Sequence, residues 1–181
     1  MQNLILFSHN NRDTLLNMRK GESKFGEHIQ LIPILTNIYD DIVNLDVDYV
    51  VFGISEDIGV YANYGNTGTY KAWEATLKIL LNIQNNKFTA ANRILILGHL
   101  DYNNERKLIS ALDPSKKKNI SKARAFVETI DKDVTHVVSS IVKAGKVPII
   151  IGGGHNNAYG NIKGCALANN SRINVVNFDA H

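Results

Sequence analysis

The stretch PIIIGGGHNNAYGN, from Pro148 to Asn161, is the most informative part of this sequence. Its run of isoleucines is typical of a strand that is buried on both faces of a parallel sheet. The three glycines that follow let the backbone turn sharply and let a ligand or a neighbouring side chain approach closely. In open α/β sheets, ligands bind beyond the carboxyl ends of the strands. The stretch therefore predicts a binding site at the tip of a strand, either for a phosphate group or for a metal ion.

Strands and helices are expected to alternate along the rest of the chain. The apolar runs that predict buried strands lie at 48–54, 92–98, 147–151 and 173–178. Apolar residues recur at helical spacing over 70–81 and 123–141, and a shorter helix is expected over 156–168. The lysine-rich segment 113–119 is expected to be a solvated loop. This alternation predicts an α/β fold, with a parallel sheet and helices on both faces.

The composition is that of a soluble globular protein. The chain has 181 residues, which fits one domain, and 44% of them are hydrophobic while 20% are charged. A net charge of +3 is too weak a bias to indicate nucleic-acid binding, and no apolar run approaches membrane-spanning length. Cys165 is the only cysteine, so an internal disulfide is impossible and a reducing compartment is expected. We therefore expect a cytoplasmic protein with neither a nucleic acid nor a membrane as partner.

The chain ends on VVNFDAH, so an apolar strand pattern runs to its last residue. A buried strand that carries polar groups at its tip is an unusual place for a natural domain to end. We therefore expect residues 1–181 to be the N-terminal part of a single domain of a longer protein, with an incomplete sheet.

One interpretation of the glycine loop is a nucleotide site. The dinucleotide fingerprint is G-x-G-x-x-G, whereas Gly152, Gly154 and Asn157 give G-x-G-x-x-N. The missing third glycine is the one that lets helix and strand pack closely. Asp179 ends the next expected strand, roughly where an acid that binds ribose could lie. A nucleotide-binding α/β domain that uses the loop Gly152–Gly154 is therefore an alternative function.

The other interpretation, a metal site, explains more of the polar residues. His155 lies in the glycine loop, and Asp179 and His181 follow the next expected strand. Residues two apart in an extended segment point the same way, so this carboxylate and imidazole converge. Oxygen and nitrogen donors without a thiolate suit Mn²⁺, Fe²⁺ or Zn²⁺. We therefore expect His155, Asp179 and His181 to lie together at the carboxyl edge of the sheet.

GGGHNNAYG followed by NFDAH resembles the motifs of the ureohydrolases, the family of arginase, agmatinase and formimidoylglutamase. That family carries G-G-[GD]-H after one strand and D-A-H-x-D after the next. GGGH with AYG is most similar to the formimidoylglutamase branch, and GVYANYGNTGTYKAWEATLKILLN is similar to an early loop and helix of the family. The resemblance covers about residues 48–181 and is highly specific only over 147–181. It implies an arginase-like three-layer α/β/α domain, of which residues 1–181 are the N-terminal part.

The resemblance also implies a binuclear Mn²⁺ site, with His155, Asp179 and His181 as ligands. The second aspartate of D-A-H-x-D and a later D-x-D pair are absent from the sequence. With about half the ligands, this chain alone is expected to bind Mn²⁺ weakly and to hydrolyse nothing. The implied reaction is hydrolysis of a linear amidine or guanidine, and for the formimidoylglutamase branch it converts formimidoylglutamate to glutamate and formamide.

Further expectations concern the substrate and the partners. Asn63, Asn66 and Asn157 are candidate substrate-binding residues, although asparagine also favours turns for local reasons. No residue is assigned a catalytic role. A small-molecule substrate and a homo-oligomer are expected. A non-catalytic homologue with the arginase fold is the third possible function.

Overall fold

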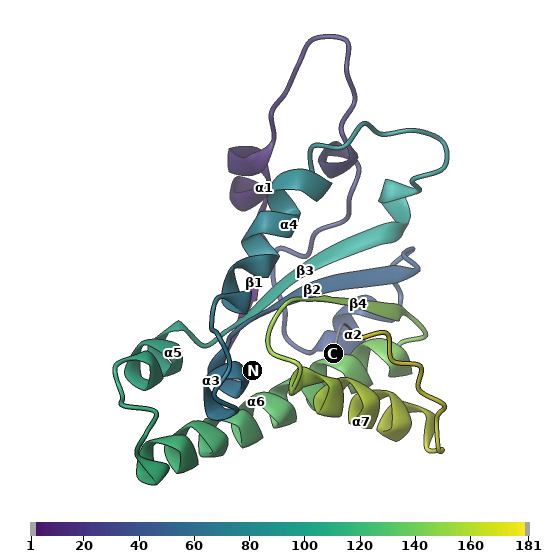
Figure 1. Ribbon diagram of the computed structural model, residues 1–181. Coiled ribbons are helices and arrows are strands. Elements are labelled where there is room, and N and C mark those ends of the chain that lie inside the picture. The colour runs from purple at the N-terminus through teal and green to yellow at the C-terminus, as the bar shows by residue number, and fades with distance from the viewer. Residues whose placement is uncertain (1–2, 180–181) are drawn as a thin grey trace.

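A four-stranded sheet forms the centre of the molecule, whose computed structural model describes residues 3–179 (Figure 1). The strands are β1 (Leu4–Leu6), β2 (Tyr49–Ser55), β3 (Ile94–Asp101) and β4 (Val147–Ile151), arranged in the order β1-β3-β2-β4. β2, β3 and β4 are parallel, as predicted, whereas β1 pairs with β3 in the antiparallel direction. The sheet is therefore mixed. A short edge strand has only one neighbour, and many parallel sheets carry such an antiparallel edge.

Helices cover both faces of this sheet. They are α1 (His9–Leu15), α2 (Ile38–Ile42), α3 (Ile58–Ala62), α4 (Ala72–Leu80), α5 (Asn103–Ser110), α6 (Lys117–Lys143) and α7 (Asn157–Asn169), and short 3₁₀ turns lie at Phe25–Glu27, Thr69–Lys71 and Ala91–Arg93. In Figure 1, α1 and α4 lie on one side of the sheet, and α6 and α7 lie on the other. The three-layer α/β/α arrangement expected from the sequence is thus confirmed.

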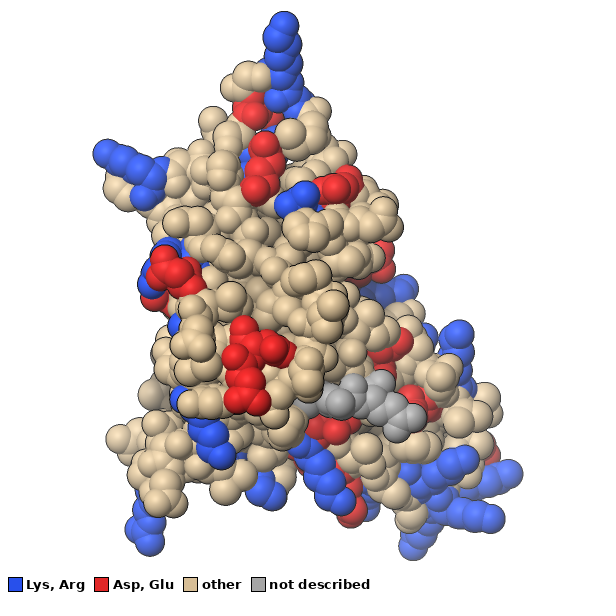
Figure 2. Space-filling model, turned by 180° about the vertical axis from the view of Figure 1, so that it is seen from behind, with Lys and Arg blue, Asp and Glu red and all other residues tan. Residues whose placement is uncertain are grey.

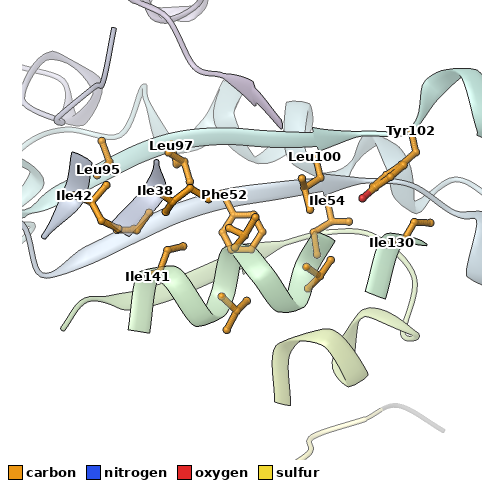
Figure 3. Packing of buried hydrophobic residues seen from close by; sticks show 14 of the residues in the cluster. Ile38, Ile42, Phe52, Ile54, Leu95, Leu97, Leu100, Tyr102, Ile130 and Ile141 are labelled. Atoms are coloured by element: carbon orange, nitrogen blue, oxygen red, sulfur yellow. The ribbon is translucent and has the colours of Figure 1, made fainter. Parts of the chain in front are cut away.

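The larger core lies between the sheet and α6. Figure 3 shows Phe52 and Ile54 of β2 facing Ile130 and Ile141 of α6. The buried residues of α6 recur at helical spacing, so the predicted apolar stripe is the face that packs on the sheet. The polar first turn of α6 explains why the prediction for residues 113–119 was partly wrong. The segment 113–119 is not wholly a loop, because α6 already begins at Lys117 and exposes its lysines there.

A second core fills the opposite face of the sheet. Trp73 and Leu77 of α4 pack there with Val51 of β2 and Ile96 of β3. Alternate residues of β2 thus point to opposite faces, so both faces of the strand are buried. This explains why its sequence is continuously apolar.

α7 packs closely on α6 and thereby fixes the loop that precedes it. An added Cβ at Gly160 would lie 2.8 Å from the Cβ of Val134, and one at Gly164 would lie 2.7 Å from the Cβ of Val138. The two glycines therefore let the helix backbones approach closely. Because α7 begins at Asn157, this packing holds the segment Gly152–Asn156 against the end of the sheet.

The predicted strand 173–178 is wrong for this structure. Residues 172–179 form neither helix nor strand, and Val176 and Phe178 are exposed, the latter by 94%. Within residues 3–179, β4 pairs only with β2. An apolar run becomes a strand only when a neighbour accepts and donates its backbone hydrogen bonds. Here no neighbouring strand does so.

Two further observations concern the surface of the molecule. Charged side chains of both signs are spread over the face shown in Figure 2, so this face carries no large field of a single sign. Among the helices within residues 3–179, none combines the length and the apolar character needed to cross a membrane, and the first two thirds of α6 carry many charged residues.

A glycine at a β-bulge gives the first testable prediction. Gly98 has φ +136° and lies where the register between β2 and β3 shifts, and a Cβ there would overlap the carbonyl oxygen of Ile5. Gly98→Ala should lower the free energy of unfolding by about 2–4 kcal/mol, through backbone strain and displacement of β1. Urea denaturation measures this change.

Gly68→Ala is a matched control for that substitution. Gly68 has a similar φ of +142° but open space around its Cβ position. The two variants share the backbone strain and differ in the overlap with β1. Equal losses of stability in both would contradict the proposed clash.

Candidate functional site

Two parallel strands end side by side at the candidate site. β2 and β4 are neighbours, with Gly53 opposite Ile151. Their carboxyl ends therefore lie at the same edge of the sheet. Glu56 and Asp57 follow β2, and the glycine loop follows β4. The polar residues after both strands thus meet at one place.

The backbone conformation of the loop after β4 requires glycine. Gly152 and Gly153 have φ of +80° and +84°, values that favour glycine. An added Cβ at Gly153 would overlap the side-chain nitrogen of Asn157, and one at Gly154 would overlap the side-chain oxygen of Asn156. The loop therefore needs glycine both to turn and to pass close to the start of α7.

A buried carboxylate lies beneath this loop. Glu56 is 0% exposed, and its Oε1 accepts hydrogen bonds from Gly154 N at 2.8 Å and from Asn157 Nδ2 at 2.7 Å. Its Oε2 accepts from Ile58 N at 2.8 Å and from Gly59 N at 3.3 Å. Four donors satisfy a charge that would otherwise be very unfavourable to bury. Glu56 thus ties the loop after β4 to the start of α3.

Glu56 was not among the residues predicted from the sequence. The feature that could have indicated it is the position of this carboxylate directly after a strand that is buried on both faces. In a parallel sheet that position lies at the same edge as the ends of the neighbouring strands. Its partner loop is 98 residues away along the chain, so only the pairing of β2 with β4 reveals the contact.

Asp57 fixes the next loop in a similar way. Its Oδ2 accepts a hydrogen bond from Gly68 N at 2.8 Å, which closes the segment between α3 and the turn at Thr69–Lys71. Burial raises the pKa of Asp57 above its usual value, while the hydrogen bond from Gly68 acts in the opposite direction. Asn63 lies within this closed loop.

The structure brings two of the three predicted metal ligands together. His155 Nδ1 lies 3.1 Å from Asp179 Oδ2, over a cavity of about 570 Å³. The cavity is lined by Gly59, Val60, Asn63, Gly65, His155, Asn156 and Asp179. His181 lies outside the described residues. Within residues 3–179, no three side chains of His, Cys, Asp or Glu gather closely enough to hold an ion.

The chemistry of this pair fits a divalent ion such as Mn²⁺. Imidazole nitrogen and carboxylate oxygen are donors that Mn²⁺ accepts, and the pair contains no thiolate. Neighbouring ligands of an octahedral ion with bonds of about 2.1 Å lie about 3 Å apart. The separation of 3.1 Å between His155 Nδ1 and Asp179 Oδ2 agrees with this value.

The three asparagines predicted to bind substrate lie in different surroundings. Asn63 lines the cavity beside His155, whereas Asn66 is exposed on the same loop and is not among the lining residues. Asn157 is buried and donates to Glu56. Its position suits holding the loop, and the substrate role of all three stays a prediction.

The same contacts argue against a phosphate at the glycine loop. The N–H of Gly154, which a phosphate-binding loop would direct at its ligand, donates to the carboxylate of Glu56. A phosphate placed there would compete for this donor and lie beside a buried negative charge. Like charges in a poorly solvated place repel strongly. The geometry therefore disfavours the nucleotide alternative.

Comparisons with known proteins identify the family of the chain. The profile of the Arginase family matches residues 47–181, well over half of the chain. Formimidoylglutamase from Chromobacterium violaceum is 47% identical over 45 residues, which are 24% of this chain and 15% of that protein. Formimidoylglutamases from Macrococcus caseolyticus and Klebsiella pneumoniae are 28% and 24% identical over 135 residues, which are 74% of this chain and 36% of each relative.

The chain thus spans between 15% and 36% of the length of these relatives. No solved structure matches it. The family predicted from the GGGH and DAH motifs is nevertheless confirmed by the match over residues 47–181, and the chain belongs to the arginase family.

Proposed function

We propose that this chain is part of a metal-dependent hydrolase of linear amidines, with formimidoylglutamate as substrate and glutamate and formamide as products. One observation carries the proposal. His155 and Asp179, which lie on either side of α7 in the sequence, meet at 3.1 Å over a cavity at the carboxyl edge of the sheet. Membership of the arginase family and the names of the relatives support the same reaction class.

The proposed metal is Mn²⁺, held by His155 and Asp179 and, as the resemblance implies, by His181. The chemistry that a pair of such ions supplies when bound is activation of water at neutral pH. The carboxylate of Asp179 would offset part of the ionic charge. Glu56 holds the backbone of the loop, so that His155 is presented at a fixed place. A water molecule adds to the amidine carbon, and the bond from that carbon to the glutamate nitrogen breaks.

The cavity also suggests where the substrate would lie. It opens between the loop that contains Asn63 and the pair His155–Asp179. Its volume of about 570 Å³ is in the range that holds small metabolites. We propose that the side-chain amide of Asn63 contacts the substrate there. Asn63→Ala should then raise KM several-fold and change kcat little, because Asn63 is not placed to hold the metal.

The reaction itself is tested by product analysis. Protein expressed from the complete gene is incubated with Mn²⁺ and formimidoylglutamate, and formamide and glutamate are measured. Arginine and agmatine are supplied in parallel, with urea as the product measured. Release of formamide supports the proposal. Release of urea from arginine or agmatine would instead favour the reaction of another member of the family. Absence of any hydrolysis would favour a non-catalytic homologue.

Metal binding by this chain is tested separately. Mn²⁺ should raise the melting temperature of the chain by a small amount, and Asp179→Asn should remove most of that rise, because the carboxylate charge is lost. The matched control is Asp113→Asn, an exposed aspartate before α6 that pairs only with nearby polar groups. If Asp179→Asn keeps the full Mn²⁺ effect, Asp179 is not a ligand. Stabilisation by ATP or NAD in place of Mn²⁺ would support the nucleotide alternative.

A further inference from the structure

A second cavity lies on the face of the sheet that α4 covers. It has a volume of about 380 Å³ and is lined by residues of α1, β1, β2, β3 and α4, among them Ser55, Trp73 and His99. It shares no lining residue with the cavity at His155. Its volume lies within the range of pockets that hold small molecules. Nothing in the proposed amidine hydrolysis uses it.

A β-bulge turns His99 into this cavity. In β3, Ile96 belongs to the core under α4 and Leu97 to the core under α6, as alternation requires. The register then shifts, and His99 pairs with Gly53 on the side of Trp73. Without the extra residue, His99 would point into the apolar core under α6. β-bulges commonly redirect a side chain in this way, and many of them lie next to functional sites.

Trp73 forms the aromatic wall beside this histidine. The centroids of the Trp73 and His99 rings are 6.2 Å apart and their planes are inclined by 34°. Gly53 makes room for the indole, since a Cβ there would overlap the Trp73 ring. The ring is therefore fixed in place by the strand behind it.

Two polar side chains of the cavity have unused hydrogen-bonding capacity. Within residues 3–179, neither the hydroxyl of Ser55 nor the ring of His99 makes a hydrogen bond to the protein, although Ser55 is only 9% exposed. Burial lowers the pKa of His99, so its imidazole is neutral and offers one donor and one acceptor. Polar groups that are so nearly buried are normally paired.

Several other polar groups around the cavity are already engaged, and the ammonium of Lys71 lies over the ring of Tyr70, 5.5 Å from its centroid. Asn11 pairs with Ser8 in the cap of α1, and the carboxylate of Glu74 pairs with Lys78 at 2.6 Å. Asn103 accepts from the guanidinium of Arg106. Among the described lining residues, no carboxylate or guanidinium is left unpaired, and the one free ammonium, that of Lys71, belongs to an exposed residue that stays hydrated. A cationic ligand would lose its hydration there without gaining a carboxylate partner.

We propose that this cavity binds a small, neutral, planar molecule whose edge carries a hydrogen-bond donor beside an acceptor, as in a ring lactam. Ser55 and His99 pair with that edge, and Trp73 packs against the ring. The site is independent of the metal ligands.

Fluorescence gives a direct test, because Trp73 is the only tryptophan of the chain. Uracil, a neutral planar lactam, is titrated into the protein while tryptophan emission is followed. A saturable change is expected. Ser55→Ala and His99→Phe should each weaken binding about fivefold to tenfold, since each removes one hydrogen bond to the ligand. The control His136→Phe, at an exposed position of α6, should bind as the unmodified chain does.

Two results would overturn the proposal. The first is the absence of a saturable change in tryptophan emission when uracil is added. The second is an unchanged affinity in Ser55→Ala, which removes only a hydroxyl without a protein partner and should fold normally. The second test stands even if His99→Phe proves unstable. Titration of Mn²⁺ in the same variants should be unaffected, which separates this site from the one at His155.

Discussion

Glu56→Ala should lower the free energy of unfolding by about 3–5 kcal/mol, a large fraction of the stability of a typical domain. The substitution leaves four donors without their acceptor: the backbone N–H groups of Ile58, Gly59 and Gly154 and the side-chain amide of Asn157. Each unsatisfied buried donor costs about 1–3 kcal/mol, and water entering the vacated space recovers part of the total. Urea denaturation followed by circular dichroism measures the loss.

Two further variants locate the cause of this loss. Glu56→Gln keeps the shape and one acceptor oxygen, but its NH₂ group faces two N–H donors, so an intermediate loss is expected. Glu128→Ala, at an exposed position of α6, should change stability little. Amide hydrogen exchange at Gly154 should accelerate in the Glu56 variants. Stability of Glu56→Ala equal to that of Glu128→Ala would refute the anchoring role.

His155→Ala should reduce amidine hydrolysis by more than about a hundredfold in protein from the complete gene, because loss of an outer-shell partner alone can cost that much. Affinity for Mn²⁺ should fall in parallel. The stability of the fold should stay nearly unchanged, since the His155 side chain is 59% exposed. Product release at a series of Mn²⁺ concentrations, together with thermal unfolding, measures all three effects.

His136→Ala supplies the matched control for this histidine. His136 is exposed on α6 and does not line the cavity at His155, so its loss should leave turnover and Mn²⁺ affinity unaltered. Near-normal turnover of His155→Ala at saturating Mn²⁺ would mean that this histidine is structural. The metal centre would then need other ligands.

The strands and the long helix could be predicted because their signals are local. Val51 and Phe52 belong to the cores on opposite faces of the sheet. A strand that is buried on both faces has a continuously apolar sequence, and this run is easily recognised. The stripe of α6 likewise follows from residues such as Ile130 and Ile141, which share one face. The meeting of His155 and Asp179 was predicted from their residue types and is seen in the structure, although the strand expected to carry Asp179 does not form.

Residues whose neighbours are distant in the sequence could not be placed in this way. In the sequence, Glu56 resembles an ordinary acidic residue of a loop. Only the pairing of β2 with β4 brings the glycine loop above it. His99 would be assigned to the wrong face by simple alternation, because one extra residue at the bulge reverses the pattern.

Local sequence signals therefore predicted the α/β class, the three parallel strands, the amphipathic helices and the glycine loop with its histidine, because these depend on residues adjacent along the chain. Tertiary structure alone decided that the apolar run 173–178 is not a strand, that β1 runs antiparallel, and that Glu56 is buried rather than solvated. The physical reason is common to all three. A strand needs a partner for its backbone hydrogen bonds, and a buried carboxylate needs donors, and both are supplied by segments that only folding brings near.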